Sequence, residues 1–308
     1  MNNLQSQIEN YLEFCCAQKR LDEKTLKAYK IDLQQFAEQF ANPEIEAKTV
    51  TPDLLEQYIS SLHKKYKPKS VKRKIASLKA LFHYFEYRDI IDRNPFGKIQ
   101  VRFREPVILP KTIPLSTVEL FLSTIYTQRR GEGTPCHKRN ALRDAAVAEL
   151  LFATGMRISE LCNLGSANVD LNDGTILIYG KGDKERRLQI GNEDVIKILK
   201  EYRDEFGSEI ADSGNFFVNH RGRALSDQAV RRMINKYTKL ASIEQHITPH
   251  MFRHTFATSL LEADVDIRYI QEMLGHSSIN ITEIYTHVAV GKQRDILSTK
   301  HPRGKFRV

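Results

Sequence analysis

Apolar residues in the first hundred positions recur at helical spacing, and this periodicity constrains the fold more than any other feature of the chain. In the first stripe the steps between apolar residues are 3, 4, 3 and 4, which places them on one face of a helix. We therefore predict a domain of amphipathic helices packed through three such stripes. The stripes consist of Leu26, Tyr29, Leu33, Phe36 and Phe40, then Leu54, Leu55, Tyr58, Ile59 and Leu62, and then Val71, Ile75, Leu78, Phe82 and Phe85.

A stretch with several prolines ends this pattern and divides the chain. Prolines follow one another from Pro95 to Pro114, and the stretch between them is basic. Since a chain of 308 residues exceeds the roughly 100 to 200 residues of one domain, we predict two domains. The boundaries are a helical domain at 1–100, an extended basic linker at 101–113 and a second domain at 114–308. Ser116 and Glu119 have the spacing of a capping box that opens the next helix.

The second domain mixes two periodicities. Residues 175–179 and 187–190 flank a turn that contains glycines and predict a β-hairpin. Helical patterns occupy residues 143–154, ended by Gly155, and residues 192–206 and 226–241. Thr248 before Pro249 is typical of a further helix start. The predicted fold class is mainly α with a small antiparallel β-sheet, an α+β arrangement.

The charge of the chain favours an anionic partner. Its 47 Lys and Arg residues against 38 Asp and Glu residues give a net charge of +9. No apolar run approaches the roughly 20 residues that span a bilayer, so we expect no membrane partner. The N-terminus lacks a secretory signal, and the four cysteines have no metal or disulfide spacing. We therefore expect a cytoplasmic protein with reduced thiols.

A basic run lies between the second and third stripes. Residues 63–74 carry seven Lys or Arg and no acidic residue, whereas residues 197–209 mix both signs. A solvated helix face is the ordinary explanation, but the single sign favours contacts with DNA phosphates, which position DNA without reading its sequence. The predicted phosphate-contacting residues, including two in the linker, are Lys67, Lys69, Lys72, Arg73, Lys74, Lys79, Arg102 and Arg104.

Four short segments of the second domain combine basic residues or histidines with glycines or a helix start: residues 154–161, 180–185, 248–254 and 274–278. A fifth segment, residues 284–287, contains a tyrosine and a histidine. Each has an ordinary explanation when taken alone. Arg157 follows a helix C-cap, Lys181 occupies a tight turn, and Tyr285 suits a core position at the end of a helix. His254 and His287 are explained most simply as structural residues.

A zinc site is the rival interpretation of residues 248–254. His250 and His254 have the i, i+4 spacing of two metal ligands on a helix. The residues between them are Met-Phe-Arg, without the glutamate of zinc proteases, and Arg253 would repel a dication. We therefore expect neither a metal ion nor another cofactor.

The five segments occur together and in order, and together they resemble the active site of the tyrosine recombinases, the family of phage integrases and Xer recombinases. The resemblance covers residues 115–301 and, more loosely, the helical N-terminal domain. It implies a SAM-like core-DNA-binding domain and a catalytic domain whose C-terminal tail packs into a neighbouring protomer. The catalytic set that it implies is Arg157 in GMRISEL, Lys181 in GKGDKER, His250 and Arg253 in PHMFRH, His276 in LGHSS and Tyr285 in IYTHV.

These residue types suit attack on a DNA phosphodiester. The nonbridging oxygens are negative, and guanidinium groups stay charged and bind such oxygens in a fork, as Arg157 and Arg253 would. With a pKa near 10, only about a thousandth of free tyrosine is phenolate at pH 7, so Tyr285 needs cations or a base nearby.

The resemblance also implies the roles. Tyr285 attacks the scissile phosphate and leaves a 3′-phosphotyrosyl link, while Lys181 protonates the departing 5′-oxygen. His250 assists proton transfer, His276 hydrogen-bonds the phosphate, and Glu160 supports the site through its neighbours. Because the link conserves the energy of the bond, the strands can be rejoined without ATP.

The expected partner is double-stranded DNA with paired inverted half-sites, bound by a homotetramer, alone or with a related recombinase, at the nucleoid. The core-binding helices begin within the first ten residues, so we expect no arm-binding domain of the lambda type. Residues 126–138 are longer than in Xer proteins and favour integration and excision of a mobile element. Residues 301–303 resemble Xer proteins and keep chromosome dimer resolution as the alternative. A type IB topoisomerase and a DNA-binding regulator without catalysis are less favoured alternatives.

Overall fold

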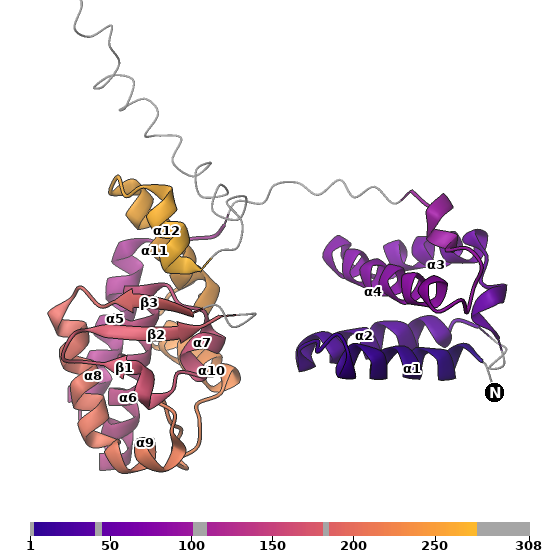
Figure 1. The fold of residues 1–308 in the computed structure, drawn as a ribbon. Helices are drawn as coiled ribbons and strands as arrows, with labels where there is room; N and C mark the ends of the chain where they lie inside the picture. The colour runs from indigo at the N-terminus through magenta and orange to yellow at the C-terminus, as the bar shows by residue number, and fades with distance from the viewer. Residues whose placement is uncertain (1–2, 41–44, 101–109, 181–184, 276–308) are drawn as a thin grey trace, which may run out of the picture. The chain divides into compact units, whose positions relative to one another are not determined.

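The computed structural model describes residues 3–40, 45–100, 110–180 and 185–275 and divides the chain into two compact units, residues 1–107 and 108–308. Each unit has its own hydrophobic core. Figure 1 shows a first unit of helices and a second unit in which a small sheet lies against helices. The predicted fold class, mainly α with a small antiparallel sheet, is therefore confirmed. The exact boundaries at 100/101 and 113/114 remain predictions.

The described part of the first unit contains four α-helices joined by loops and short 3₁₀ turns. Phe36 lies where three of the helices meet, with its ring edge-on to Tyr58 at 5.1 Å and to Phe82 at 6.1 Å between centroids. The three predicted apolar stripes all pack into this core through α2, α3 and α4, although Phe40 follows the end of α2. The elements are α1 (Leu4–Ala17), α2 (Glu23–Ala37), η1 (Ala47–Thr49), α3 (Pro52–Lys65), α4 (Pro68–Tyr87) and η2 (Pro95–Lys98).

A buried ion pair joins α2 to α4 within this core. Asp32 is 1% exposed and Lys74 is 3% exposed, and their side chains are 3.0 Å apart. Arg73 also donates to Asp32, at 2.5 Å, and the Lys74 ammonium also donates to Gln35. Lys74 is therefore not available to a DNA phosphate, and its prediction as a DNA-contacting residue is wrong because its ammonium neutralises a buried carboxylate instead.

The second unit contains the remaining elements. Its helices are α5 (Leu115–Arg130), α6 (Pro135–Thr154), α7 (Ile158–Cys162), α8 (Glu193–Glu205), α9 (Gly207–Ser213), α10 (Asp227–Leu240), α11 (Pro249–Glu262) and α12 (Ile267–Leu274), with the short turn η3 (Ser166–Asn168). Its strands are β1 (Val169–Asp170), β2 (Thr175–Tyr179) and β3 (Glu185–Gln189).

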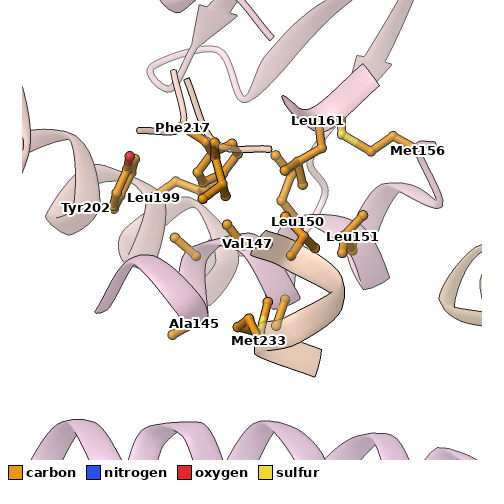
Figure 2. Packing of buried hydrophobic residues seen from close by; sticks show 14 of the residues in the cluster. Ala145, Val147, Leu150, Leu151, Met156, Leu161, Leu199, Tyr202, Phe217 and Met233 are labelled. Carbon is orange, nitrogen blue, oxygen red and sulfur yellow. The ribbon is translucent and has the colours of Figure 1, made fainter. Parts of the chain in front are cut away.

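Helix α6 forms the centre of the second unit. Its buried residues include the consecutive positions 144–148, so more than one face of the helix is covered. Figure 2 shows Val147, Leu150 and Leu151 of α6 among side chains from α7, α8 and α10. Helix α6 also packs against α11, the helix that carries His250 and Arg253. The C-terminal end of α6 lies beside α11, since Arg253 donates to Gly155.

The sheet has the order β1-β2-β3 and is antiparallel throughout. In the predicted hairpin, Ile176 pairs with Leu188 and Ile178 pairs with Arg186. Ile176, Ile178 and Leu188 are buried, so this set of alternating positions faces the core. The hairpin prediction is confirmed, with β3 beginning two residues earlier than expected.

Two predicted helix starts have different outcomes. Thr248 is the N-cap of α11 and Pro249 is its first residue, as predicted. The capping box at Ser116 and Glu119 is wrong, because α5 already begins at Leu115 and its N-cap is Pro114. The fixed φ angle of proline holds the chain in the extended conformation that precedes a helix. Within the described residues, no helix combines the length and apolar character that a bilayer span requires.

The buried ion pair generates a stability prediction. Replacing Lys74 with methionine leaves the Asp32 carboxylate buried without its closest buried cation, which should lower the free energy of unfolding of the first unit by about 3 kcal/mol. Lys69→Met is the matched control, since Lys69 is an exposed lysine of the same helix and should change the value by less than about 0.5 kcal/mol. Urea unfolding followed by circular dichroism measures both, with each unit fitted separately. Equal stability of the two variants would contradict a structural role for Lys74.

Candidate active site

A left-handed turn at Gly155 positions Arg157, the first arginine of the predicted catalytic set. Gly155 ends α6 with φ +59°, and Arg157 follows two residues later as the N-cap of α7. A Cβ atom at position 155 would lie 2.5 Å from the ring of Phe256 on α11. Only glycine therefore combines the left-handed backbone with this close approach of α6 to α11.

The Arg157 side chain is held at both ends of its guanidinium. Its Nη1 donates to Glu160 Oε1 at 2.8 Å, and its Nη2 donates to the carbonyl oxygen of Gly275 at 3.4 Å. Its backbone N–H donates to Glu160 Oε2 at 2.7 Å. The side chain remains 36% exposed, so its guanidinium is oriented by the protein and accessible from solvent.

Arg253 on α11 contacts the turn after α6 and the C-terminal end of α12. Its Nη1 donates to the carbonyl oxygen of Gly155 at 2.8 Å, and its Nη2 donates to that of Leu274 at 2.5 Å. The residue is only 5% exposed. The two arginines are therefore brought together by the turn after α6 and by the C-terminal end of α12, and this juxtaposition concentrates positive charge.

Two histidines lie on α11 together with Arg253. Partial desolvation and then the charges of Arg231, Arg253 and Arg157 lower the pKa of His250, although the residue reaches the surface. The lowered pKa favours the neutral imidazole of His250, which is the form that accepts a proton. Burial, followed by His250 and Arg253, lowers the pKa of His254 to about 4, so this side chain is also neutral.

In the described part of the chain, the fold brings no further metal ligands to His250 and His254. Among the residues that the structure describes, no group of three or more His, Cys, Asp or Glu side chains is arranged to hold a metal ion. The expectation that no cofactor is required stays a prediction.

Several predicted site residues lie outside the described residues. These are Lys181, His276 and Tyr285 of the catalytic set and Arg102 and Arg104 of the DNA-contacting set. In the sequence, Lys181 follows Gly180 at the end of the β2 region, and His276 follows Gly275, the C-cap of α12. Of the catalytic set, the structure thus brings together Arg157, His250 and Arg253.

Glu160 has a partner that sequence reasoning missed. Arg186 of β3 donates to both Glu160 oxygens, from Nη1 at 3.0 Å and from Nη2 at 2.7 Å. The alternation of the hairpin contained a signal, since Arg186 occupies the same face as the buried Leu188. A charged residue on the covered face of a strand needs a counter-ion, and Glu160 supplies it.

The predicted DNA-contacting residues of the first unit differ in exposure. Arg73 has a half-exposed side chain, 46% accessible, although it also pairs with Asp32. Lys74 does not belong to this set, because its ammonium is buried beside Asp32. The residues whose side chains lie at the surface are Lys67, Lys69, Lys72 and Lys79.

Comparison with known proteins identifies the family. The profile of the phage integrase family matches residues 131–292, and that of the phage integrase N-terminal SAM-like domain matches residues 8–88. A protein of Agathobacter rectalis named tyrosine recombinase is 68% identical over 306 residues, which is 99% of each chain. Tyrosine recombinase XerD of Listeria innocua is 36% identical over 98% of this chain and 100% of its own length.

A solved structure shares the fold. The XerH site-specific recombinase, bound to palindromic difH substrate in a post-cleavage complex, superposes with a TM-score of 0.76 at 24% identity. The match covers 96% of this chain and 84% of that one. The matched domains and the two relatives show that the chain belongs to the phage integrase family of tyrosine recombinases, enzymes that cleave and rejoin DNA.

Proposed function

We propose that this recombinase exchanges strands at specific DNA sites through a covalent link between Tyr285 and a 3′-phosphate. The observation that carries the proposal is the convergence of Arg157 and Arg253 on the Gly155 turn and the end of α12, with a neutral His250 close by. This arrangement supplies fixed positive charge where a phosphodiester develops negative charge during attack.

In the cleavage step, the phenolic oxygen of Tyr285 forms a bond to phosphorus and the bond from phosphorus to the 5′-oxygen breaks. The phenolic proton passes to His250, whose lowered pKa leaves its imidazole free to take it. Arg157 and Arg253 bind the nonbridging oxygens, and His276 adds a hydrogen bond to them. Lys181 gives its proton to the departing 5′-oxygen. Reversal of the same steps on a new 5′-hydroxyl rejoins the strand without ATP or a metal ion.

We propose paired inverted half-sites as the DNA partner and a homotetramer, alone or with a related recombinase, as the active assembly. The palindromic substrate of the XerH structure supports the half-site arrangement. The exposed lysines Lys67, Lys69, Lys72 and Lys79 support sequence-independent contacts of the first unit with phosphates. Such an enzyme works at the nucleoid, in the cytoplasm.

For the biological role we propose integration and excision of a mobile element. The length of residues 126–138 supports this role. Residues 126–130 form the end of α5 and residues 135–138 form the start of α6. Chromosome dimer resolution is the second candidate, favoured by the likeness to XerD over nearly the whole chain.

Substitution of the nucleophile tests the chemistry. Tyr285→Phe should abolish the covalent protein–DNA adduct on a nicked suicide duplex, because phenylalanine has no oxygen to attack phosphorus. Binding should stay within about threefold, since the hydroxyl contributes little to the phosphate contacts that dominate affinity. Denaturing gel electrophoresis measures the adduct and a gel-shift titration measures binding. Adduct retained by the variant would refute the assignment of Tyr285.

A sulfur-substituted substrate tests Lys181 as the general acid. Lys181→Ala should slow cleavage of ordinary DNA by about 10² to 10⁴, the usual contribution of a positioned acid. A 5′-bridging phosphorothiolate has a leaving group that hardly needs a proton, so it should restore the rate of the variant to near that of the wild type. If Lys181→Ala stays slow on this substrate, Lys181 is not the general acid that protonates the departing 5′-oxygen.

Deletion of the gene in its host separates the two biological roles. If the enzyme serves a mobile element, polymerase chain reaction across the element's ends should detect an excised circle in the wild type and none in the deletion strain. Cell division should be unaffected. Filamentous cells with unsegregated chromosomes, combined with normal excision, would instead establish dimer resolution.

A further inference from the structure

Arg186 connects three segments of the second unit through one guanidinium. Nη1 and Nη2 donate to Glu160 of α7, at 3.0 and 2.7 Å, and Nε donates to the carbonyl oxygen of Met273 on α12 at 3.0 Å. The side chain itself belongs to β3 and is only 10% exposed. A side chain held at all three nitrogen positions has little freedom to move, so it fixes the segments relative to one another.

The alternation of the hairpin explains why Arg186 points inward. Arg186 pairs with the buried Ile178, and Leu188, two residues further along β3, is buried on the same face. The next residue, Arg187, pairs with Leu177 and is exposed. Two adjacent arginines of one strand thus have opposite environments, and only Arg186 faces α7 and α12.

Glu160 divides its carboxylate between two arginines. Its Oε1 accepts from Nη1 of Arg157 and Nη1 of Arg186, and its Oε2 accepts from the backbone N–H of Arg157 and Nη2 of Arg186. The Glu160 side chain is 7% exposed. Burial raises the pKa of Glu160, but the hydrogen bonds from Arg186 and Arg157 outweigh it and hold the pKa below its ordinary value. Arg186 therefore helps to keep this carboxylate charged and oriented toward Arg157.

The close fit around Gly275 is a separate observation. Gly275 has φ +63°, and a Cβ atom there would lie 2.9 Å from Nη1 of Arg186. The carbonyl oxygen of the same residue accepts from Nη2 of Arg157. Arg186 thus packs against the residue that Arg157 contacts, so it borders Arg157's anchors on both α7 and α12.

We propose that Arg186 is a positioning residue for the catalytic Arg157. It holds Glu160 and the end of α12 in the places from which both contact the Arg157 guanidinium. The inference rests on the proposed role of Arg157 at the scissile phosphate. It assigns to the β2–β3 hairpin a second contribution to catalysis, besides carrying Lys181.

The test compares two substitutions in the full-length chain, Arg186→Gln and Arg187→Gln. Both remove one positive charge from β3, but only the first removes the contacts to Glu160. At saturating protein on the nicked suicide duplex, Arg186→Gln should slow adduct formation by about 10- to 100-fold, the scale expected when a catalytic group is misplaced by about an ångström. Arg187→Gln should stay within about twofold. Both should bind DNA with similar affinity, so that the defect lies in the chemical step.

A conservative variant separates positioning from folding. Arg186→Lys keeps a cation against Glu160 but cannot form the fork, so it should fold with nearly the wild-type melting temperature and still cleave several-fold more slowly. Wild-type cleavage by Arg186→Lys or by Arg186→Gln would overturn the proposal. So would a loss of DNA affinity that accounts for the whole defect.

Two further comparisons locate the effect at Arg157. In the cycle of Glu160→Gln and Arg186→Gln, the double variant should be no slower than the slower single variant, because both act on one guanidinium. Rate losses that multiply would overturn the proposal. The 5′-bridging phosphorothiolate should not rescue Arg186→Gln, and rescue would mean that Arg186 acts on Lys181 instead. The proposed cleavage chemistry is tested separately, by adduct formation in the wild type and its loss in Tyr285→Phe. Failure of that chemistry can therefore be distinguished from failure of the role proposed for Arg186.

Discussion

The active site depends on the burial of the Arg253 guanidinium against backbone carbonyl oxygens. Removing a charge from water is costly unless its donors are satisfied, and the carbonyls of Gly155 and Leu274 accept two of its hydrogen bonds. A carbonyl satisfies a donor without cancelling its charge, so these bonds hold the cation while preserving its positive field. The left-handed turn at Gly155 is what presents one of these carbonyls, and the same turn leads directly to Arg157. One backbone feature thus places both arginines of the proposed catalytic set.

A carboxylate, unlike a carbonyl oxygen, cancels the charge of the buried cation that it pairs with. In this chain such pairs stabilise the fold. Asp32 neutralises Lys74 inside the first unit, and Glu160 pairs with Arg186 inside the second. The cationic residues that produce the net charge of +9 therefore lie in different environments. Some cations are buried beside acids and support the fold, some are exposed along α4, and Arg157 lies between these extremes because it contacts Glu160 and remains accessible. A total charge cannot distinguish these environments.

Much of the fold follows from local patterns, because a helix stripe or an alternating strand records which face is buried. The apolar stripes of α2, α3 and α4, the β2–β3 hairpin and the start of α11 at Pro249 were all predictable in this way. The burial of Lys74 had a local signal as well, since it lies three residues after Val71 and four before Leu78, in line with the apolar stripe. That signal was overlooked because seven of the residues in the run 63–74 are basic. The choice of partner was not predictable, because Asp32 lies 42 residues away and is brought near only by packing of α2 on α4.

The same distinction applies to the catalytic residues. The resemblance to the family supplied the identity of Arg157, His250 and Arg253, but the anchors that hold the two arginines belong to segments distant in the sequence. Arg253 donates to a residue 98 positions away, and Arg157 to one 118 positions away. These anchors all lie within the second unit, so the arrangement of the two guanidiniums is established by the folding of that unit. Catalysis by fixed charges requires such preorganisation, since groups that must first be oriented lose part of their stabilising energy to reorganisation. The turn at Gly155, the carboxylate of Glu160 and the end of α12 are therefore as important to the proposed catalytic site as the arginines that they hold.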